Sequence, residues 1–207
     1  TEQGIDTSED GYKRLPEFIK NSQEKKSYLV VRMLNQDTNM KILENKNAQE
    51  LIISESVRIA KENEMEGIVL DLEIQGIPFE SFVSTITDFN KDFYTAIKKE
   101  NLFFGTFIYG DAYYRARPFN ISEIGKNADR VFVMAYDFSK ARGNPGPNFP
   151  FEEADYGYSF KTMIQDFMSQ VPKQKLTVVF GMFGYDWVID EQGRGKNQAT
   201  AKSTFEF

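Results

Sequence analysis

The chain has 207 residues, a net charge of −6, and neither histidine nor cysteine. An acidic chain without a basic cluster is a poor candidate for binding DNA or RNA. Without these two residue types there is no disulfide or thiolate chemistry and no histidine zinc ligand, so acid–base catalysis would fall to Asp, Glu, Tyr or Lys. No apolar run reaches the roughly 20 residues of a membrane span, and we expect no cofactor.

Patterns typical of helices and strands alternate along the chain. Polar residues and a cluster of glycine and proline predict the two main loops. In chain order, we expect a helix at 11–26, a strand at 27–34, a loop at 35–41, a helix at 47–63, a strand at 67–73, a helix at 78–100, a strand at 102–109, a short helix or turn at 120–127, a strand at 130–138, a loop at 139–155, a helix at 159–170 and a strand at 176–183.

This alternation predicts an α/β protein built from parallel βα units, in a single domain spanning 1–207. No glycine-rich dinucleotide fingerprint follows any strand, so a (β/α)8 TIM-type barrel is favoured over an open doubly wound sheet. A full barrel typically needs about 250 residues and eight strands. Five strands are visible, so we expect an incomplete barrel.

Two carboxylates, Asp71 and Glu73, close the apolar run at 68–70. Residues two apart in a strand point to the same face, so the two acids should lie side by side. When carboxyl groups share a site, one pKa rises, which is how a general acid is made at neutral pH. The alternative is that the strand simply ends there and both acids meet water.

Three stretches, the first of which contains these two acids, resemble the sequence motifs of a known family. Gly67-Ile68-Val69-Leu70-Asp71-Leu72-Glu73 resembles the strand-4 motif Asp-Gly-x-Asp-x-Asp-x-Glu of glycoside hydrolase family 18, the chitinase-like barrels. Val133-Met134-Ala135-Tyr136-Asp137 is similar to the family's strand-6 motif, and a Gly/Pro loop follows it. Gly181 to Trp187 is similar to the strand-7 region, and its Gly-Tyr-Asp-Trp ending resembles the bacterial spore-cortex and cell-wall branch.

The sequence also departs from the family pattern. Glu66 and Val69 stand where the motif has its first two Asp residues, and Phe183 stands where strand 7 usually has Tyr. The visible strands correspond to family strands 3 to 7. Strands 1, 2 and 8 are not apparent, and neither is the Trp of strand 8.

The resemblance implies a retaining, substrate-assisted hydrolysis of β-1,4 links beside N-acetylglucosamine in chitin, peptidoglycan or an N-glycan core. Glu73 would donate the proton, Asp71 would orient the acetamide, and Tyr136 would donate a hydrogen bond to its oxygen. It further implies a polysaccharide or glycan as partner, a monomer, and an extracellular or cell-wall location.

A second group of residues is expected to bind the substrate. Asp137 and Met134 would shape the floor of the site, and Asp111 follows a strand that ends at the same rim. Tyr185 and Trp187 could be platforms for sugar rings, or they could pack under an insertion.

Two other interpretations stay open. The chain could be a catalytically inactive chitinase-like barrel that holds glycan, which the loss of two motif acids favours. It could also be an unrelated metal-dependent barrel that uses Asp71, Glu73 and Asp137 as oxygen ligands.

Overall fold

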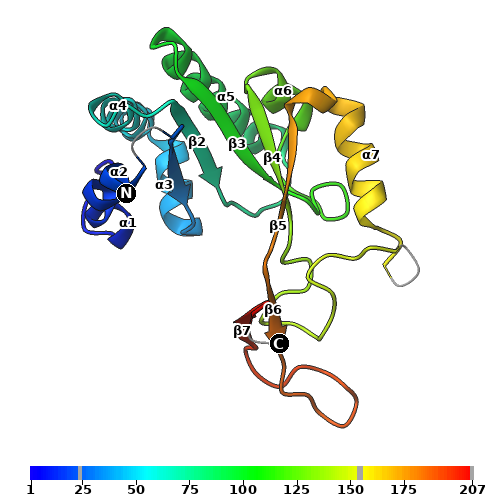
Figure 1. Ribbon diagram of the computed structural model, residues 1–207. Helices are drawn as coiled ribbons and strands as arrows, with labels where there is room; N and C mark the ends of the chain where they lie inside the picture. The colour runs from blue at the N-terminus through cyan, green and yellow to red at the C-terminus, as the bar shows by residue number, and fades with distance from the viewer. Residues whose placement is uncertain (23–24, 153–155, 206–207) are drawn as a thin grey trace. The chain divides into compact units, whose positions relative to one another are not determined.

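The computed structural model describes residues 1–22, 25–152 and 156–205. Its main feature is one five-stranded sheet in the order β1-β2-β3-β4-β5, the order in which the strands occur in the chain (Figure 1). The elements are α1 (Asp10–Lys13), α2 (Leu15–Asn21), β1 (Tyr28–Met33), α3 (Gln36–Glu44), α4 (Lys46–Glu62), β2 (Gly67–Leu72), α5 (Glu80–Lys99), β3 (Phe103–Tyr109), α6 (Ile121–Lys126), β4 (Arg130–Ala135), α7 (Phe160–Gln170), the 3-10 turn η1 (Lys173–Lys175), β5 (Leu176–Phe180), β6 (Phe183–Asp186) and β7 (Thr200–Ser203).

A sequential strand order separates the two α/β architectures. A doubly wound sheet reverses its order at a switch point, whereas a barrel adds each new strand beside the last one. The order found here is that of a barrel, and the sheet has two open edges among the described residues, at β1 and β5. The prediction of an α/β fold with an incomplete TIM-type barrel is therefore confirmed.

The chain divides into two compact units. The first comprises residues 1–107 and 116–131, and the second comprises residues 108–115 and 132–207.

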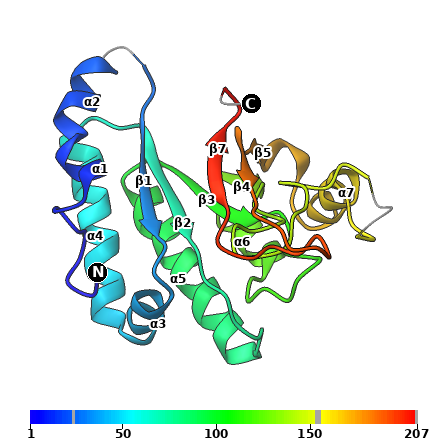
Figure 2. The same cartoon turned by 90° about the horizontal axis from the view of Figure 1, so that it is seen from below.

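In the first unit, β1, β2 and β3 form consecutive parallel pairs. Helix α4 packs on β1 and β2 and contacts α5, while α3 contacts both helices. Figure 2 shows α4 running alongside β1. All six residues of β2 are buried, because the strand has neighbours on both sides and helices over it.

The core of the first unit is aromatic and aliphatic. Phe93 of α5 stacks on Phe104 of β3 with ring centroids 6.0 Å apart, and it meets Phe89 edge-on at 5.2 Å. None of the three rings is exposed to solvent. These pairs form because the apolar residues of α5 recur every three or four positions and so face the sheet together.

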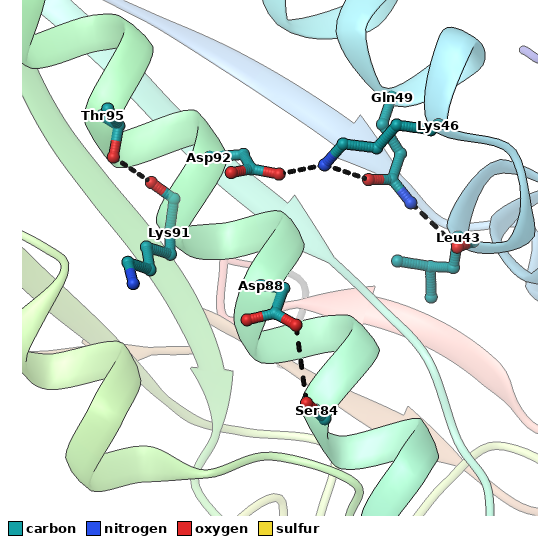
Figure 3. Close-up of polar contacts among 8 residues, drawn as sticks. All are labelled: Leu43, Lys46, Gln49, Ser84, Asp88, Lys91, Asp92 and Thr95. Carbon is teal, nitrogen blue, oxygen red and sulfur yellow. Dashed lines mark hydrogen bonds and ion pairs between the residues drawn. The ribbon is translucent and has the colours of Figure 1, made fainter.

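Polar contacts tie the helices of the first unit together (Figure 3). Lys46, at the start of α4, forms an ion pair with Asp92 of α5. The Gln49 side chain donates 2.8 Å to the carbonyl of Leu43, which joins the end of α3 to the first turns of α4. The link matters because α3 helps to hold the end of β2, as shown below.

The second unit contains the antiparallel hairpin β6–β7 and a separate aromatic core. Phe138 lies at its centre and contacts the rings of Phe149 (5.5 Å), Tyr158 (6.4 Å) and Tyr114 (5.0 Å). The hydroxyl of Tyr158 donates 3.0 Å to the carbonyl of Gly110, so this buried phenol is satisfied within the unit.

Several sequence predictions about local structure are wrong. The polar stretch at 35–41 begins helix α3, because the Asn35 side chain caps it by accepting from the Thr38 amide at 2.9 Å. The helix expected at 11–26 is two short helices, α1 and α2, with Pro16 in the first turn of α2. Residues 23–24 of that range, like 153–155 of the loop expected at 139–155, lie outside the described residues.

Other differences concern exposure and length. β1 is an edge strand, and its Val30 is 45% exposed at the open edge of the sheet. The strand expected at 176–183 ends at Phe180, and Phe183 begins β6 instead. Phe79 falls within the helix expected at 78–100, but it precedes α5 and is 64% exposed. Within the described residues, no helix is both long and apolar enough to cross a bilayer.

The aromatic core gives a direct test of this packing. We expect Phe93→Ala to lower the free energy of unfolding by about 3–5 kcal/mol, because it empties a fully buried site. The exposed Phe79→Ala should change it by less than about 0.5 kcal/mol. Urea denaturation followed by circular dichroism would measure both, and equal effects would contradict the packing described here.

Candidate active site

The end of β2 brings the two predicted acids to one place. Asp71 lies within the strand, beside Arg32 of β1 in the parallel register, and Glu73 follows directly after it. At the other end of the strand, Gly67 is required by a close approach: a Cβ atom there would lie 2.2 Å from the Phe103 carbonyl oxygen of β3. The glycine therefore lets β3 pair tightly with β2.

Asp71 is a buried carboxylate with one engaged oxygen. Its residue is only 8% exposed, and its Oδ2 lies 3.6 Å from Nε of Arg32. Its Oδ1 is buried and has no hydrogen-bond partner among the residues that the structure describes. Burial raises the pKa of Asp71 above its ordinary value, and the Arg32 cation opposes that rise. A buried acceptor without a donor is costly, so it marks a position that a ligand could satisfy.

The backbone of Glu73 is fixed from two sides. Its amide donates 2.9 Å to the Met33 carbonyl, and its own carbonyl accepts 2.8 Å from the Asn39 side chain. The same Asn39 amide also donates 2.7 Å to Met33. One turn earlier in α3, Gln36 forms two hydrogen bonds with the backbone of Gln75. Helix α3 therefore holds the segment that carries the proposed acid.

In the second unit, Asp137 follows Tyr136 at the end of β4 in a left-handed backbone conformation, with φ of +56°. Non-glycine residues adopt this region rarely and at some cost, and such residues are concentrated at functional sites. The conformation is held by Asn148, which accepts 2.7 Å from the Asp137 amide and donates 2.8 Å to the Phe183 carbonyl. The Tyr136 ring lies 6.0 Å from the ring of Phe183.

Tyr185 and Trp187 join this cluster from β6 and the residue that follows it. The Tyr185 hydroxyl donates 2.7 Å to Oδ1 of Asp137, and burial together with this bond raises the pKa of Tyr185 to about 12. The phenol therefore stays protonated at every physiological pH. The Trp187 ring lies 5.5 Å from Tyr185, and its indole nitrogen is buried without a partner.

A hollow of about 320 Å³ lies beside the aromatic core of the second unit. Arg115 forms one wall: it pairs with the buried Asp111, donates 2.9 Å to the Phe138 carbonyl, and lies 4.5 Å over the Phe138 ring. Aromatic, amide and cationic groups together suit a sugar, because its ring can stack on an aromatic face and its hydroxyls can form hydrogen bonds with the amide and the cation. The lining residues are Tyr114, Arg115, Phe138, Ser139, Lys140, Gly143, Asn144 and Tyr156.

The structure thus places the predicted residues in two groups. Asp71 and Glu73 lie in the first unit, and Tyr136, Asp137, Tyr185 and Asp111 lie in the second. That they act on one ligand stays a prediction. The carbonyl of Met134 accepts from the Gly110 amide at 3.0 Å. Because Met134 is buried, its side chain has little surface for a sugar.

Sequence reasoning missed the residues that support these side chains. Arg32 reads as one charge within an apolar strand, and Asn39 and Asn148 read as loop asparagines. Nothing in their local pattern signals the distant groups that they bind. Within the described residues, no group of three acidic side chains that could hold a metal ion is found.

Comparison with known proteins places the chain in a family. The model of the glycosyl hydrolases family 18 matches residues 7–206. The protein named sporulation-specific glycosylase YdhD, from Bacillus subtilis (strain 168), is 33% identical over 76 residues, which are 37% of this chain and 17% of YdhD.

Solved structures share the fold at low sequence identity. The crystal structure of YdhD has a TM-score of 0.77 at 17% identity, covering 99% of this chain and 67% of that one. The Bacillus cereus spore cortex-lytic enzyme SleL has a TM-score of 0.77 at 18% identity, covering 100% of this chain and 47% of that one. A class V chitinase from Nicotiana tobaccum, in complex with NAG4, has a TM-score of 0.74 at 18% identity and covers 97% of this chain and 62% of that one.

The chain therefore spans between about half and two thirds of the length of these structures. Nearly all of its residues match the family model, and these neighbours share its fold. We conclude that the chain belongs to glycosyl hydrolase family 18.

Proposed function

We propose that this protein is a glycosidase that cleaves β-1,4 links beside N-acetylglucosamine in a glycan such as chitin, peptidoglycan or an N-glycan core, by a substrate-assisted retaining mechanism. Family membership supports the glycosidase class. The observation that carries the proposal is the acid pair at the end of β2, where the buried Asp71 keeps one oxygen without a partner beside Glu73.

The chemistry divides between the two acids. The acetamide carbonyl oxygen of the sugar attacks its own anomeric carbon, the glycosidic C–O bond breaks, and Glu73 gives its proton to the leaving oxygen. Water then attacks the same carbon, the bond between that carbon and the acetamide oxygen breaks, and Glu73 takes a proton from the water, so the acid is regenerated with net retention. No protein nucleophile is needed, which is why one positioned acid suffices.

Asp71 would serve the intermediate. Its open Oδ1 would accept the acetamide N–H, and its negative charge would stabilise the positive oxazolinium ion that forms. Tyr136 would donate a hydrogen bond to the acetamide oxygen and hold it in line with the anomeric carbon. The chain has no histidine, so the proton donor is a carboxyl group and we expect a mildly acidic pH optimum.

The second unit would bind the sugar units. Tyr185 is hydrogen-bonded to Asp137 and its ring contacts that of Trp187, and the hollow beside Arg115 offers aromatic faces and one side-chain amide, Asn144. Glycans of this kind lie outside the cell or in its wall, so we place the protein there, acting as a monomer.

A glycan-binding protein without activity is the second candidate. Val69 favours it, because it stands where the family motif has an acid on the same strand face as Asp71. Glu66 does not count in its favour. It lies at the opposite end of β2, roughly 16 Å along the strand from Asp71, and its carboxylate faces Lys26 at 3.8 Å.

Turnover of a fluorogenic N-acetylglucosamine oligomer separates the two candidates. We expect Glu73→Gln in the native protein to lower kcat by about 100- to 10,000-fold with binding retained, because it removes the proton donor. The matched control Glu66→Gln should leave turnover within about twofold. Binding without turnover in the wild type would establish the glycan-binding protein instead, and neither binding nor turnover would refute both.

Asp71→Asn should separate activity from stability. The pKa of Asp71 is raised in the folded chain above its ordinary value of 3.8. As pH rises above that value, the unfolded chain loses this proton more readily than the folded chain, so the free energy of unfolding falls. We expect the substitution to abolish most turnover yet raise the free energy of unfolding at pH 7 by about 0.5–2 kcal/mol. Denaturation curves from pH 3 to 7 would measure this. The gain should vanish toward the acid end, and a loss of stability at pH 7 would contradict the assignment.

A further inference from the structure

We propose that Arg32 is a positioning residue for the hydrolysis proposed above: it holds the buried carboxylate of Asp71 through one oxygen and so leaves the other open to the substrate. The inference rests on the proposed function for its catalytic meaning. The contact itself belongs to the structure and can be tested without any substrate.

The geometry assigns different tasks to the two oxygens of Asp71. Oδ2 faces the Arg32 guanidinium, with 3.6 Å between Oδ2 and Nε, and Oδ1 is buried without a donor. The two residues are direct neighbours in the β1–β2 register, so their side chains leave the sheet on the same face. A planar guanidinium fixes the orientation of a carboxylate better than an ammonium can.

Among the described residues, Arg32 is the charged group that acts on the Asp71 carboxyl. On β2 itself, the proposed proton donor Glu73 lies two residues along, and the apolar Val69 lies two residues back. The β3 residues paired with β2 are Phe103, Phe104, Gly105 and Thr106, none of which is charged. Arg32 on β1 is thus the cation recorded against Asp71.

The contact with Arg32 explains how Asp71 can stay ionised although it is buried. Burial favours the protonated form of Asp71, and a protonated Asp71 could neither accept the acetamide N–H equally well nor stabilise a positive intermediate. Arg32 opposes that effect. Its side chain is 62% exposed, so it can supply the charge from the solvent side without being buried itself.

Two substitutions and one control test the proposal in the native protein. Arg32→Gln removes the charge, and Arg32→Lys keeps the charge but loses the planar fork. The control, Lys26→Gln, breaks the Lys26–Glu66 ion pair at the opposite end of the same two strands. The first readout is the NMR titration of the Asp71 carboxyl carbon, assigned by its disappearance in Asp71→Asn. The second is the pH profile of kcat/KM on an N-acetylglucosamine oligomer.

We expect Arg32→Gln to move the Asp71 titration to higher pH and to lower kcat/KM by about 10- to 100-fold. The acid limb of the profile should move in the same direction, because the ionised fraction of Asp71 falls at each pH. Arg32→Lys should restore most of the titration but only part of the activity, and Lys26→Gln should change neither.

An Asp71 titration that is the same in Arg32→Gln and wild type would overturn the proposal, whatever the activity. If the wild type hydrolyses no N-acetylglucosamine oligomer, the proposed function fails, and the NMR titration still decides whether Arg32 controls Asp71. Circular dichroism of each variant would show that a loss of activity is not a loss of fold.

Discussion

A carboxylate removed from water at the end of a buried strand is the constraint on which the rest of this site depends. Asp71 lies at that position because β2 has strands on both sides and helices over it, and the burial makes its charge expensive. One cation, Arg32, compensates this charge, and hydrogen-bond donors do not surround both oxygens of the carboxylate among the described residues. Oδ1 of Asp71, which has no partner among the described residues, is the group with which this end of β2 can bind a ligand.

The supporting contacts share one device, the side-chain amide that bridges two backbone groups. Asn39 joins the carbonyls of Met33 and Glu73 in the first unit, and Asn148 joins the amide of Asp137 to the carbonyl of Phe183 in the second. An amide can both donate and accept without carrying a charge. Each amide therefore fixes the end of a strand beside a titratable group without adding a charge that would shift the pKa of that group.

Long apolar patterns were read correctly from the sequence, and capped or edge segments were not. The helix expected at 78–100 is α5, because its apolar residues recur over many turns, and the strand expected at 67–73 is β2, because its apolar run is continuous. Helix α3 was missed because its first turn is polar and its formation depends on the cap at Asn35. The exposure of Val30 was missed because an open edge is a property of the sheet, not of the strand.

The sequence by itself determined the parallel α/β class, the family resemblance and the spacing that puts Asp71 and Glu73 on one strand face, since all three follow from the period of the chain and from local motifs. The tertiary structure alone decided that Oδ1 of Asp71 stays open and that Arg32 faces Oδ2. The first fact depends on the burial of a single atom, and the second joins residues that are 39 positions apart. No local pattern encodes them, because burial and pairing exist only once the strands and helices have packed.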